Sequence, residues 1–364
     1  MVPIDRSEPE ADTTIGWEEI ACPLCAAVDE EPVIAVPAET GRAVYRVVRC
    51  RRCGMGYLNP RPDIPSIGQF YPREYEEYQL PRRRRQGWWR RMRDRLERLV
   101  LSHHYGYPPP LERWYEKALA VVLGPWLRPG PDSLTGLRYH GDGRLLDFGC
   151  GSGWYAYRMA QRGWKVTGMD FSAHAAQQVT QRFGIPVLVG SLPHPEVADE
   201  SFDVIVMGCV LEHVHHPHEV IAGAARALRP GGWLVVVVPN LDSWGFRFFG
   251  PDWWPLELPR HLLHFTPATL RRLVETHGLQ VCEEGMLLRG GWMRRSLAIC
   301  RRRPYRPAGR RLLAHLGRTR LVSSLLSHWT VWTGQADCIM VVARRPSPAL
   351  PSPFVTAGRS PQAA

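Results

Sequence analysis

The amino-acid sequence predicts an α/β fold with a mainly parallel sheet, and three observations support this prediction. First, strand-sized apolar segments recur after residue 144, and segments of helical composition separate them. Second, the first two of these strands end at an acidic side chain that could bind a ligand. Arg144–Leu146 is followed by Asp147, and Lys165–Asp170 ends in Asp170. Third, further apolar strands cover Phe202–Met207 and the stretch up to Pro239. Strands that alternate with helices form βαβ units, in which the strands lie parallel.

The loop after the first of these strands contains three glycines, at 149, 151 and 153, and leads into a predicted helix over 154–161. A loop that runs from a parallel strand to a helix N-terminus is where α/β folds bind ligands. The dinucleotide fingerprint has glycines at its first, third and sixth positions. Here the sixth position is the bulky Trp154, and no Gly-Lys-Ser/Thr follows. The loop therefore predicts a nucleoside-like cofactor and excludes a dinucleotide cradle and a P-loop.

Asp170 adds to this prediction because it ends the next strand, about 20 residues after Asp147. A carboxylate at that distance is placed to accept hydrogen bonds from ribose hydroxyls.

Several motifs then follow one another in a recognisable order. They are Asp147-x-Gly-x-Gly-x-Gly, the strand-end Asp170, Ser201-Phe202-Asp203-Val204, Leu211-Glu212-His213-Val214 and Leu228-Arg229-Pro230-Gly231-Gly232. In this order the chain resembles the class I S-adenosylmethionine-dependent methyltransferases over roughly 141–288. The resemblance implies a Rossmann-like seven-stranded methyltransferase sheet that ends in an antiparallel hairpin, here Leu279–Cys282 with Cys338–Ala343. The alternative is a Rossmann-like fold with another cofactor.

The resemblance also implies which residues bind S-adenosylmethionine. They are Asp147, Gly149, Cys150, Gly151, Gly153, Asp170, Phe171, Ser191 and Leu192. Asp147 would hold the amino acid end of the cofactor, Asp170 both ribose hydroxyls, and Phe171 would lie near the adenine. Ser191 departs from the family, which often has an acid there to contact the adenine amine.

Two Cys-x-x-Cys pairs near the N-terminus, Cys22 with Cys25 and Cys50 with Cys53, predict a zinc site. Four thiolates complete a closed tetrahedral site, which is structural because it leaves no open position. A redox pair and buried thiols are the alternatives. Strands near Val33–Val36 and Val44–Val48 would form a small ribbon.

The flanking sequence resembles a bacterial subgroup of these methyltransferases that carries an N-terminal four-cysteine zinc ribbon. The resemblance rests on Val48-Arg49-Cys50-Arg51-Arg52-Cys53-Gly54, on Tyr57-Leu58-Asn59-Pro60-Arg61-Pro62, and on Leu258-Pro259-Arg260-His261-Leu262-x-His264-Phe265-Thr266-Pro267. Many members of that subgroup are associated with the synthesis of polysaccharides, glycolipids or secondary metabolites.

These features divide the chain into parts. We expect a disordered tail over 1–19, the zinc ribbon over 20–71, a basic helical linker over 72–143, the methyltransferase domain over 144–345 with a basic insertion at 287–335, and a second disordered tail over 346–364.

Three histidines are candidates for chemistry on the methyl acceptor. A hydroxyl or an acidic carbon needs a base, and an imidazole suits that role. His213 follows a strand end beside the expected methyl position, so it is the candidate base; packing or cofactor gating is the alternative. His261 and His264 would contact the substrate or, alternatively, brace Arg260 and its loop. The histidine-rich run 213–218 lacks a matching acid cluster, so we expect no catalytic metal there.

The segment between Trp244 and Trp254 is rich in aromatic side chains. These predict either an apolar or sugar-stacking acceptor pocket or a lid that packs on its own domain.

The net charge of +11 comes from two arginine-rich segments, Arg82–Val100 and Arg289–Arg320. In the first, the apolar residues Trp88, Trp89, Met92, Leu96, Leu99 and Val100 recur at helical spacing among arginines. The second contains Trp292, Met293, Leu297, Leu312, Leu313 and Leu316. Basic amphipathic helices bind anionic membrane surfaces, or they dock their apolar stripe on the rest of the protein.

No apolar run approaches the ~18–20 residues of a membrane span, and the acidic start over 1–14 is no signal peptide. We therefore expect a cytoplasmic protein, with peripheral association at the inner face of the membrane as the alternative.

The favoured function is methyl transfer from S-adenosylmethionine to a small-molecule, sugar, glycan or lipid-linked acceptor. An RNA methyltransferase is the second hypothesis, but no RNA-binding module is evident, so nucleic acid is not the expected partner. A non-catalytic scaffold is the third, and the glycine loop with Asp170 argues against it.

Overall fold

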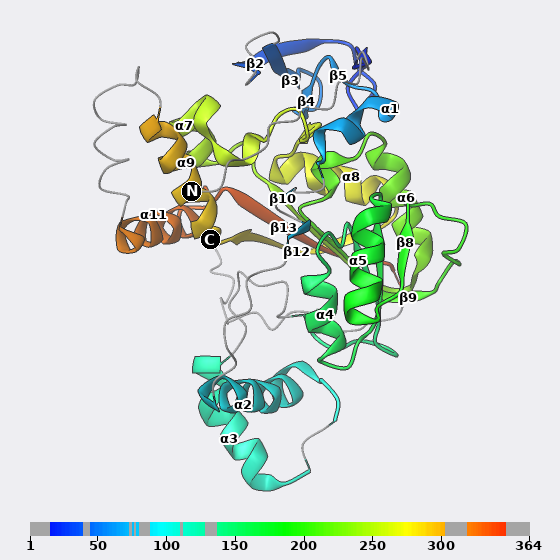
Figure 1. The fold of residues 1–364 in the computed structure, drawn as a ribbon, viewed down its shortest axis with the longest axis vertical. Coiled ribbons are helices and arrows are strands. Elements are labelled where there is room, and N and C mark those ends of the chain that lie inside the picture. Colours follow the sequence, from blue (N-terminus) through cyan, green and yellow to red (C-terminus); the bar gives the residue numbers. More distant parts are fainter. Residues whose placement is uncertain are drawn as a thin grey trace, which may run out of the picture.

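The computed structural model describes residues 15–38, 44–72, 75, 78–79, 88–109, 112–127, 137–302 and 319–346. Most of the two predicted tails and the apolar residues Leu312, Leu313 and Leu316 lie outside these ranges. Figure 1 shows three tiers, with ribbon strands at one end, an α/β body in the middle, and the helices α2 (Trp88–Tyr105) and α3 (Trp114–Leu127) at the other end.

A seven-stranded mixed sheet forms the centre of the body, which confirms the predicted fold class. Its strands lie in the order β12-β13-β10-β9-β6-β7-β8. Their bounds are β6 Arg144–Phe148, β7 Lys165–Asp170, β8 Val187–Val189, β9 Phe202–Gly208, β10 Leu228–Pro239, β12 Gln280–Leu287 and β13 Cys338–Arg344. The strands from β10 to β8 are parallel, and β13 is antiparallel to both of its neighbours. The carboxyl ends of β6, β7 and β9 therefore meet at one edge of the sheet.

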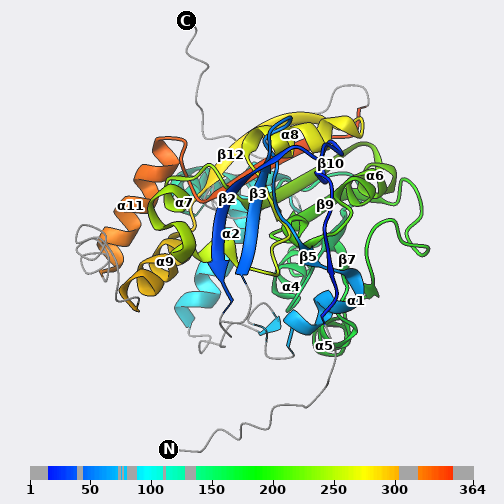
Figure 2. The ribbon, with the colours of Figure 1, turned by 90° about the horizontal axis from the view of Figure 1, so that it is seen from above.

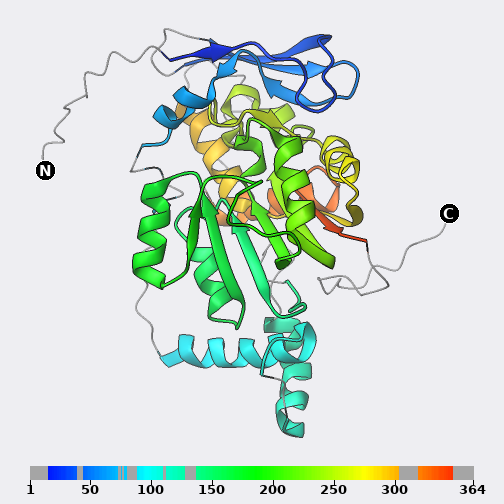
Figure 3. The same ribbon diagram turned by 90° about the vertical axis from the view of Figure 1, so that its right-hand side faces the viewer.

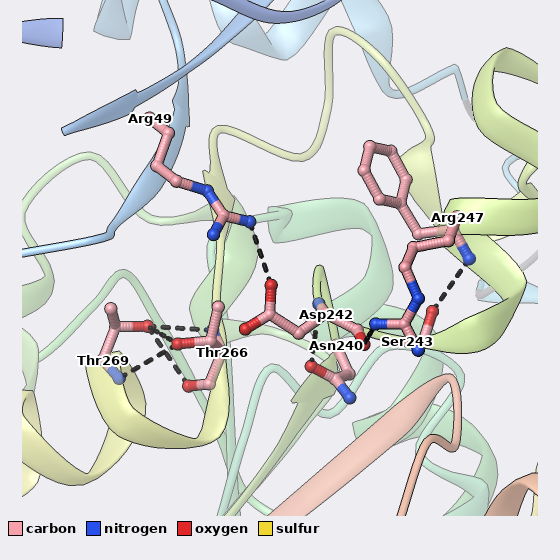
Figure 4. Close-up of polar contacts among 8 residues, drawn as sticks. Arg49, Asn240, Asp242, Ser243, Arg247, Thr266 and Thr269 are labelled. Atoms are coloured by element: carbon pink, nitrogen blue, oxygen red, sulfur yellow. Dashed lines mark hydrogen bonds and ion pairs between the residues drawn. The ribbon is translucent and has the colours of Figure 1, made fainter. Parts of the chain in front are cut away.

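Successive side chains of the central strands point to opposite faces of the sheet, and both sets are apolar, so helices cover both faces. On one face, Leu145 packs in a cluster with residues of α2, α4 and α5, and on the other Leu146 packs with residues of α6 and α8. Their bounds are α2 Trp88–Tyr105, α4 Trp154–Ala160, α5 Ala173–Phe183, α6 Pro217–Ala227 and α8 Pro267–Thr276. Side chains cap two of these helices: Ser172 caps α5, and a capping box of Thr266 and Thr269 begins α8 (Figure 4).

The N-terminal ribbon forms a second, four-stranded sheet in the order β11-β4-β3-β2. Its strands are β2 Glu30–Pro37, β3 Val44–Cys50, β4 Gly56–Leu58 and β11 Leu263–His264. The fourth strand comes from the α/β body, where Leu263 pairs with Tyr57 and His264 with Gly56. The ribbon and the α/β body thus share a sheet.

The prediction of a disordered tail over 1–19 is wrong at its end. Strand β1 (Trp17–Glu18) pairs with β5 (Arg61–Pro62), and Arg61 Nε donates a 2.7 Å hydrogen bond to Glu18 Oε1. The tail prediction rested on acidic composition alone. Composition cannot reveal that residues 17–18 pair with a strand more than 40 residues later in the chain.

The segment between β12 and β13 contains α9 (Gly290–Arg302) and α11 (Arg320–Trp332). Strand β12 extends to Leu287, well beyond the predicted Leu279–Cys282, because it pairs with β13 along its length. Figure 2 shows α9 and α11 beside α7 (Trp244–Phe249), to one side of the sheet.

Helices α2 and α3 (Trp114–Leu127) lie at the end of the molecule opposite the ribbon, as Figures 1 and 3 both show. Among the helices of the described ranges, none is both long and apolar enough to cross a bilayer.

Candidate active site

The glycine loop joins β6 to α4 with three residues in the left-handed region. Gly149, Gly151 and Gly153 have φ values of 73°, 51° and 70°. At Gly149 a Cβ would overlap Val210, and at Gly153 it would lie 2.6 Å from Val179 Cγ1. The backbone N–H groups of Gly149 and Cys150 both donate to Met169 O, at 2.7 and 3.0 Å. This loop is therefore held tightly against the end of β7, with no side chain at its glycines.

Cys150 differs from its neighbours because its side chain points into the core. It is buried in the cluster that contains Leu145, and its Sγ lies beneath Gly168. Only its backbone is available at the loop.

Two buried carboxylates lie beside the loop, at the ends of adjacent strands. Asp170 Oδ2 accepts a 2.9 Å hydrogen bond from Gly151 N, and its Oδ1 accepts one of 2.9 Å from Ser172 N. Asp147 Oδ2 has no hydrogen-bond partner among the described residues. Burial, with the nearby Asp170 charge, raises the pKa of Asp147 to about 7. An unpaired buried carboxylate is costly, so this atom is placed to receive a cationic or hydrogen-bonding group from a ligand.

Aromatic side chains from two parts of the chain meet above the carboxylates. Phe171 follows β7, is half exposed, and makes an edge contact with Tyr71 at 4.9 Å between ring centroids. Tyr71, Tyr75 and Tyr78 form a chain of edge contacts, each at 5.3 Å. Burial and the Asp170 carboxylate raise the pKa of Tyr78 to about 12. Tyr71, Tyr75 and Tyr78 thus lie close to Phe171 and the Asp170 carboxylate.

Ser191 and Leu192 follow β8 but differ in their exposure. Ser191 is exposed, whereas the Leu192 side chain is buried in the core. The preceding residue is tied to β7 by a 2.9 Å hydrogen bond from Gly190 N to Asp170 O. Only Ser191 and the backbone here are available to a ligand.

His213 ends a short 3-10 helix, η4 (Leu211–His213), just after β9. Its Nδ1 lies 2.8 Å from the Tyr71 hydroxyl and 3.2 Å from Arg260 O. Desolvation lowers the pKa of His213 to about 4, so the ring is neutral at pH 7.

His261 and His264 are both buried, and one of them adjoins His213. The rings of His213 and His261 meet at 4.6 Å between centroids. His261 Nδ1 donates to Pro255 O at 2.7 Å, which leaves Nε2 as its acceptor. His264 lies on β11, and its ring centroid is 6.4 Å from that of His261. Its Nε2 has no hydrogen-bond partner among the described residues. The structure thus brings all three predicted histidines together.

Glu212 is the most deeply buried acid of this group. It is fully inaccessible, and neither carboxylate oxygen has a hydrogen-bond partner in another described residue. Desolvation raises its pKa well above the usual range. The donor atoms of Glu212, His213 and His261 lie within 4.8 Å of one another, so this trio could also take a metal ion.

The remaining histidines of the 213–218 run form no such group. His215 Nε2 lies 3.0 Å from Pro62 O, and His218 Nε2 lies 3.1 Å from Leu24 O. Both fasten the ribbon to the body.

The aromatic segment after β10 packs largely on itself. Phe249 and Trp253 are buried against Met293 and Leu297 of α9, and Trp253 Nε1 donates a 2.8 Å hydrogen bond to Asp337 Oδ1. This arrangement supports the interpretation as a lid with its own core.

The four ribbon cysteines converge on one point. Cys22 Sγ lies 3.5 Å from Cys53 Sγ, Cys25 Sγ lies 3.6 Å from Cys50 Sγ, and all four are free thiols. These distances are close to the ~3.8 Å between sulfurs of a tetrahedral site with Zn–S bonds of about 2.3 Å. The cysteine geometry therefore fits zinc and does not fit a disulfide.

The ribbon reaches the site through several contacts besides β11. Figure 4 shows Arg49 of β3 extended to Asp242, with 2.9 Å between Nη2 and Oδ1. Arg61 Nη1 donates to His215 O at 3.0 Å, and Leu58 N donates to Leu262 O at 2.9 Å. The loops that carry the three candidate histidines are thus bonded to the ribbon.

Sequence reasoning missed Tyr71, Tyr75 and Glu257 as members of the site. Tyr75 donates a 3.1 Å hydrogen bond to Glu257 Oε1, which also accepts from Arg260 Nε at 2.9 Å. No motif or periodicity marks these residues, and only the fold brings residue 75 to residue 257.

Comparison with known proteins gives matches across the α/β body. A family model described as a methyltransferase domain matches residues 82–284, more than half of the chain. A ubiquinone biosynthesis O-methyltransferase of Idiomarina loihiensis is 29% identical over 168 residues, covering 41% of this chain and 68% of the relative. One from Bordetella avium is 32% identical over 143 residues, covering 37% and 57%. The matched regions thus span between just over half and about two thirds of these relatives.

Two solved structures can be compared in the same way. A putative methyltransferase in complex with the Trm112 methyltransferase activator of Haloferax volcanii is 19% identical, covering 59% of this chain and 87% of that one, with a TM-score of 0.42. An S-adenosylmethionine-dependent methyltransferase from Mesorhizobium loti is 19% identical, covering 61% and 97%, with a TM-score of 0.41.

Proposed function

Because the chain belongs to the class I S-adenosylmethionine-dependent methyltransferases, we propose that it is an enzyme that methylates a hydroxyl oxygen of a small-molecule acceptor. The relatives at about 30% identity are named O-methyltransferases, which supports oxygen as the accepting atom. A sugar, a glycan or a lipid-linked molecule remains within this proposal, since each offers a hydroxyl.

The observation that carries the proposal is the pair of strand-end carboxylates beside the glycine loop. Asp170 keeps free lone pairs on both oxygens although each accepts a backbone N–H, so it can bind two ribose hydroxyls. Asp147 offers its unpaired Oδ2 to the ammonium group of the amino acid end. Gly149, Gly151 and Gly153 leave room for close approach of the cofactor, and Phe171 and Ser191 would flank its adenine. The bound cofactor supplies an electrophilic methyl group on a sulfonium.

His213 is our candidate for the general base. Its Nδ1 is occupied by Tyr71 and Arg260, so Nε2 is the atom that can take the proton of the acceptor hydroxyl. The neutral ring required for this is the form that desolvation favours. His261 and His264 lie on the same side and would contact the acceptor.

The zinc ribbon is proposed to be a structural element. Four cysteines at one point complete a closed coordination shell, so the metal would hold the ribbon together and take no part in methyl transfer.

Calorimetric titration with S-adenosylmethionine tests the cofactor site. Asp170→Ala removes the acceptor of the ribose hydroxyls, so we expect binding weaker by about tenfold or more. Asp199→Ala, which removes an exposed acid, should bind like the unchanged protein. Equal affinity of the two variants would contradict the assignment.

Transfer of a labelled methyl group tests the acceptor and the base. Hydroxyl-bearing small molecules should be methylated and RNA should not. With an accepted substrate, His213→Gln should lower kcat by about 10²-fold or more while cofactor affinity stays the same. The control is His328→Gln, because His328 is exposed on α11. Labelled RNA and unlabelled small molecules would favour the RNA methyltransferase instead.

A further inference from the structure

Helix α3 exposes apolar side chains along one face. Trp114 is 80% exposed and Val122 67%, and Tyr115, Leu119 and Val121 are also exposed. Its packed face consists of small residues, Ala120 and Gly124. A contiguous apolar surface of this kind on a folded protein marks a site of interaction.

Helix α2 places positive charge next to this apolar surface. Its C-terminal half is anchored in the body by Leu101 and Tyr105, which are buried, and by a contact between Glu97 and Arg162. Near its N-terminus, Trp88 is 57% exposed and Met92 39%. Three arginines of this helix, Arg93, Arg95 and Arg98, are exposed as well.

The two helices are accessible to a large partner. Figures 1 and 3 show them at one end of the molecule, with α3 directed away from the sheet. The strands of the ribbon lie at the opposite end, so neither the ribbon nor the site stands between this surface and an approaching plane.

We propose that α2 and α3 form a docking surface for an anionic lipid bilayer. The apolar side chains of α3 and Trp88 enter the interface between headgroups and acyl chains, and the α2 arginines bind lipid phosphates. The positive charge of the exposed α2 arginines favours an anionic bilayer over a second copy of the chain. A second copy would bring the same arginines into opposition, whereas anionic headgroups neutralise them.

This inference goes beyond the proposed methyl transfer and is independent of it. The docking helices and the cofactor loop lie in different tiers of the molecule. Loss of docking should therefore leave methylation of a water-soluble acceptor unchanged.

Flotation of the full-length protein with lipid vesicles tests the proposal. The protein should float with vesicles of mixed phosphatidylcholine and phosphatidylglycerol, and not with phosphatidylcholine alone. The double variant Trp114→Ser/Val122→Ser should lower the bound fraction about tenfold or more, since two inserted side chains are lost. Arg93→Glu/Arg95→Glu should lower it similarly, by about tenfold.

The matched control is Leu321→Ser/Leu325→Ser on α11, where the side chains are 69% and 61% exposed. This variant should float like the unchanged protein. Failure of the unchanged protein to float, or an equal loss in the α11 variant, would overturn the proposal. A dimer seen by light scattering that Trp114→Ser/Val122→Ser abolishes, without any vesicle binding, would assign the surface to a second copy instead.

Discussion

Asp147 and Asp170 end neighbouring strands, yet their surroundings give them different tasks. Asp170 is satisfied on both oxygens by backbone N–H groups, which partly offset the rise in its pKa from burial. Asp147 retains an unpaired oxygen, and burial and Asp170 raise its pKa to about 7. Near neutral pH, part of the cofactor-free protein therefore holds Asp147 in its protonated form.

This ionisation predicts pH-dependent cofactor binding. A cationic amino acid end binds the ionised carboxylate, so affinity should rise as pH rises and level off above about pH 7. Below that pH the dissociation constant should change by up to about tenfold per pH unit. Calorimetry between about pH 5 and about pH 8 measures it. In Asp147→Asn the affinity should be lower and its slope with pH much reduced; an unchanged slope would show that another group titrates.

At the residue scale, candidate binding residues were easier to predict than the hydrogen-bond partners of each side chain. The glycine spacing and the acid about 20 residues later are local patterns, so they predict candidate cofactor-binding residues from the sequence alone. The pairing of His213 with Tyr71 and of His261 with Pro255 depends on contacts that only the folded chain creates. No spacing rule could have revealed these hydrogen bonds.

The two-residue strand β11 connects the ribbon to the loops of the site. It brings His264 against Gly56, and the flanking residue Leu262 accepts a hydrogen bond from Leu58 N. His261 immediately precedes this paired segment. The positions of His261 and His264 therefore depend on how closely the backbone of β4 approaches β11.

Substitution of Gly56 tests this dependence. A Cβ at residue 56 would lie 2.5 Å from Leu241 Cδ2 and 2.9 Å from His264 O. Gly56→Ala should therefore destabilise the protein by about 1–3 kcal/mol and lower kcat by displacing β11. Thermal unfolding and the methyl-transfer assay measure the two effects.

Gly68→Ala is the matched control. Nothing lies within 4 Å of a Cβ at Gly68, and its φ of −58° suits alanine. This variant should match the unchanged protein in both measurements. If Gly56→Ala did so too, the approach of β4 to β11 would not control the site.

The elements that sequence reasoning located are those with strong local signals. The alternating strands and helices and the cysteine pairs belong to this class. Strand β11 has too few residues for a strand signal, and its partner lies in the ribbon. The predicted helical linker over 72–143 includes α3, but the exposed apolar surface of this helix was not predicted. Its apolar residues follow no single stripe, so the sequence does not distinguish an exposed apolar helix from a buried one.

Over the whole molecule, the ribbon and the α/β body share one core. Cys22, Cys50 and Tyr57 belong to the same cluster of buried residues as Leu146 and Ile205. Separate domains would have separate clusters and would unfold in separate steps. A shared cluster predicts that the ribbon and the body unfold together.

Calorimetric unfolding with and without zinc tests this prediction. The zinc-loaded protein should show one transition. Removal of zinc, or Cys50→Ser, should lower the midpoint temperature of that single transition by about 10 °C or more, because several kcal/mol of folding free energy are lost. Cys282→Ser changes an exposed cysteine outside the cluster and should have little effect. Two transitions, with only the smaller one sensitive to zinc, would contradict the shared core.

The pairing of β4 with β11 also sets an order of events during synthesis. Strand β4 leaves the ribosome about 200 residues before its partner, so one edge of the ribbon sheet stays open while most of the body is made. An open edge can pair with another chain. The short length of β4, three residues, limits that hazard. The ribbon can thus form early around its cysteines, but the surface that completes the site is created only when residues 263–264 arrive.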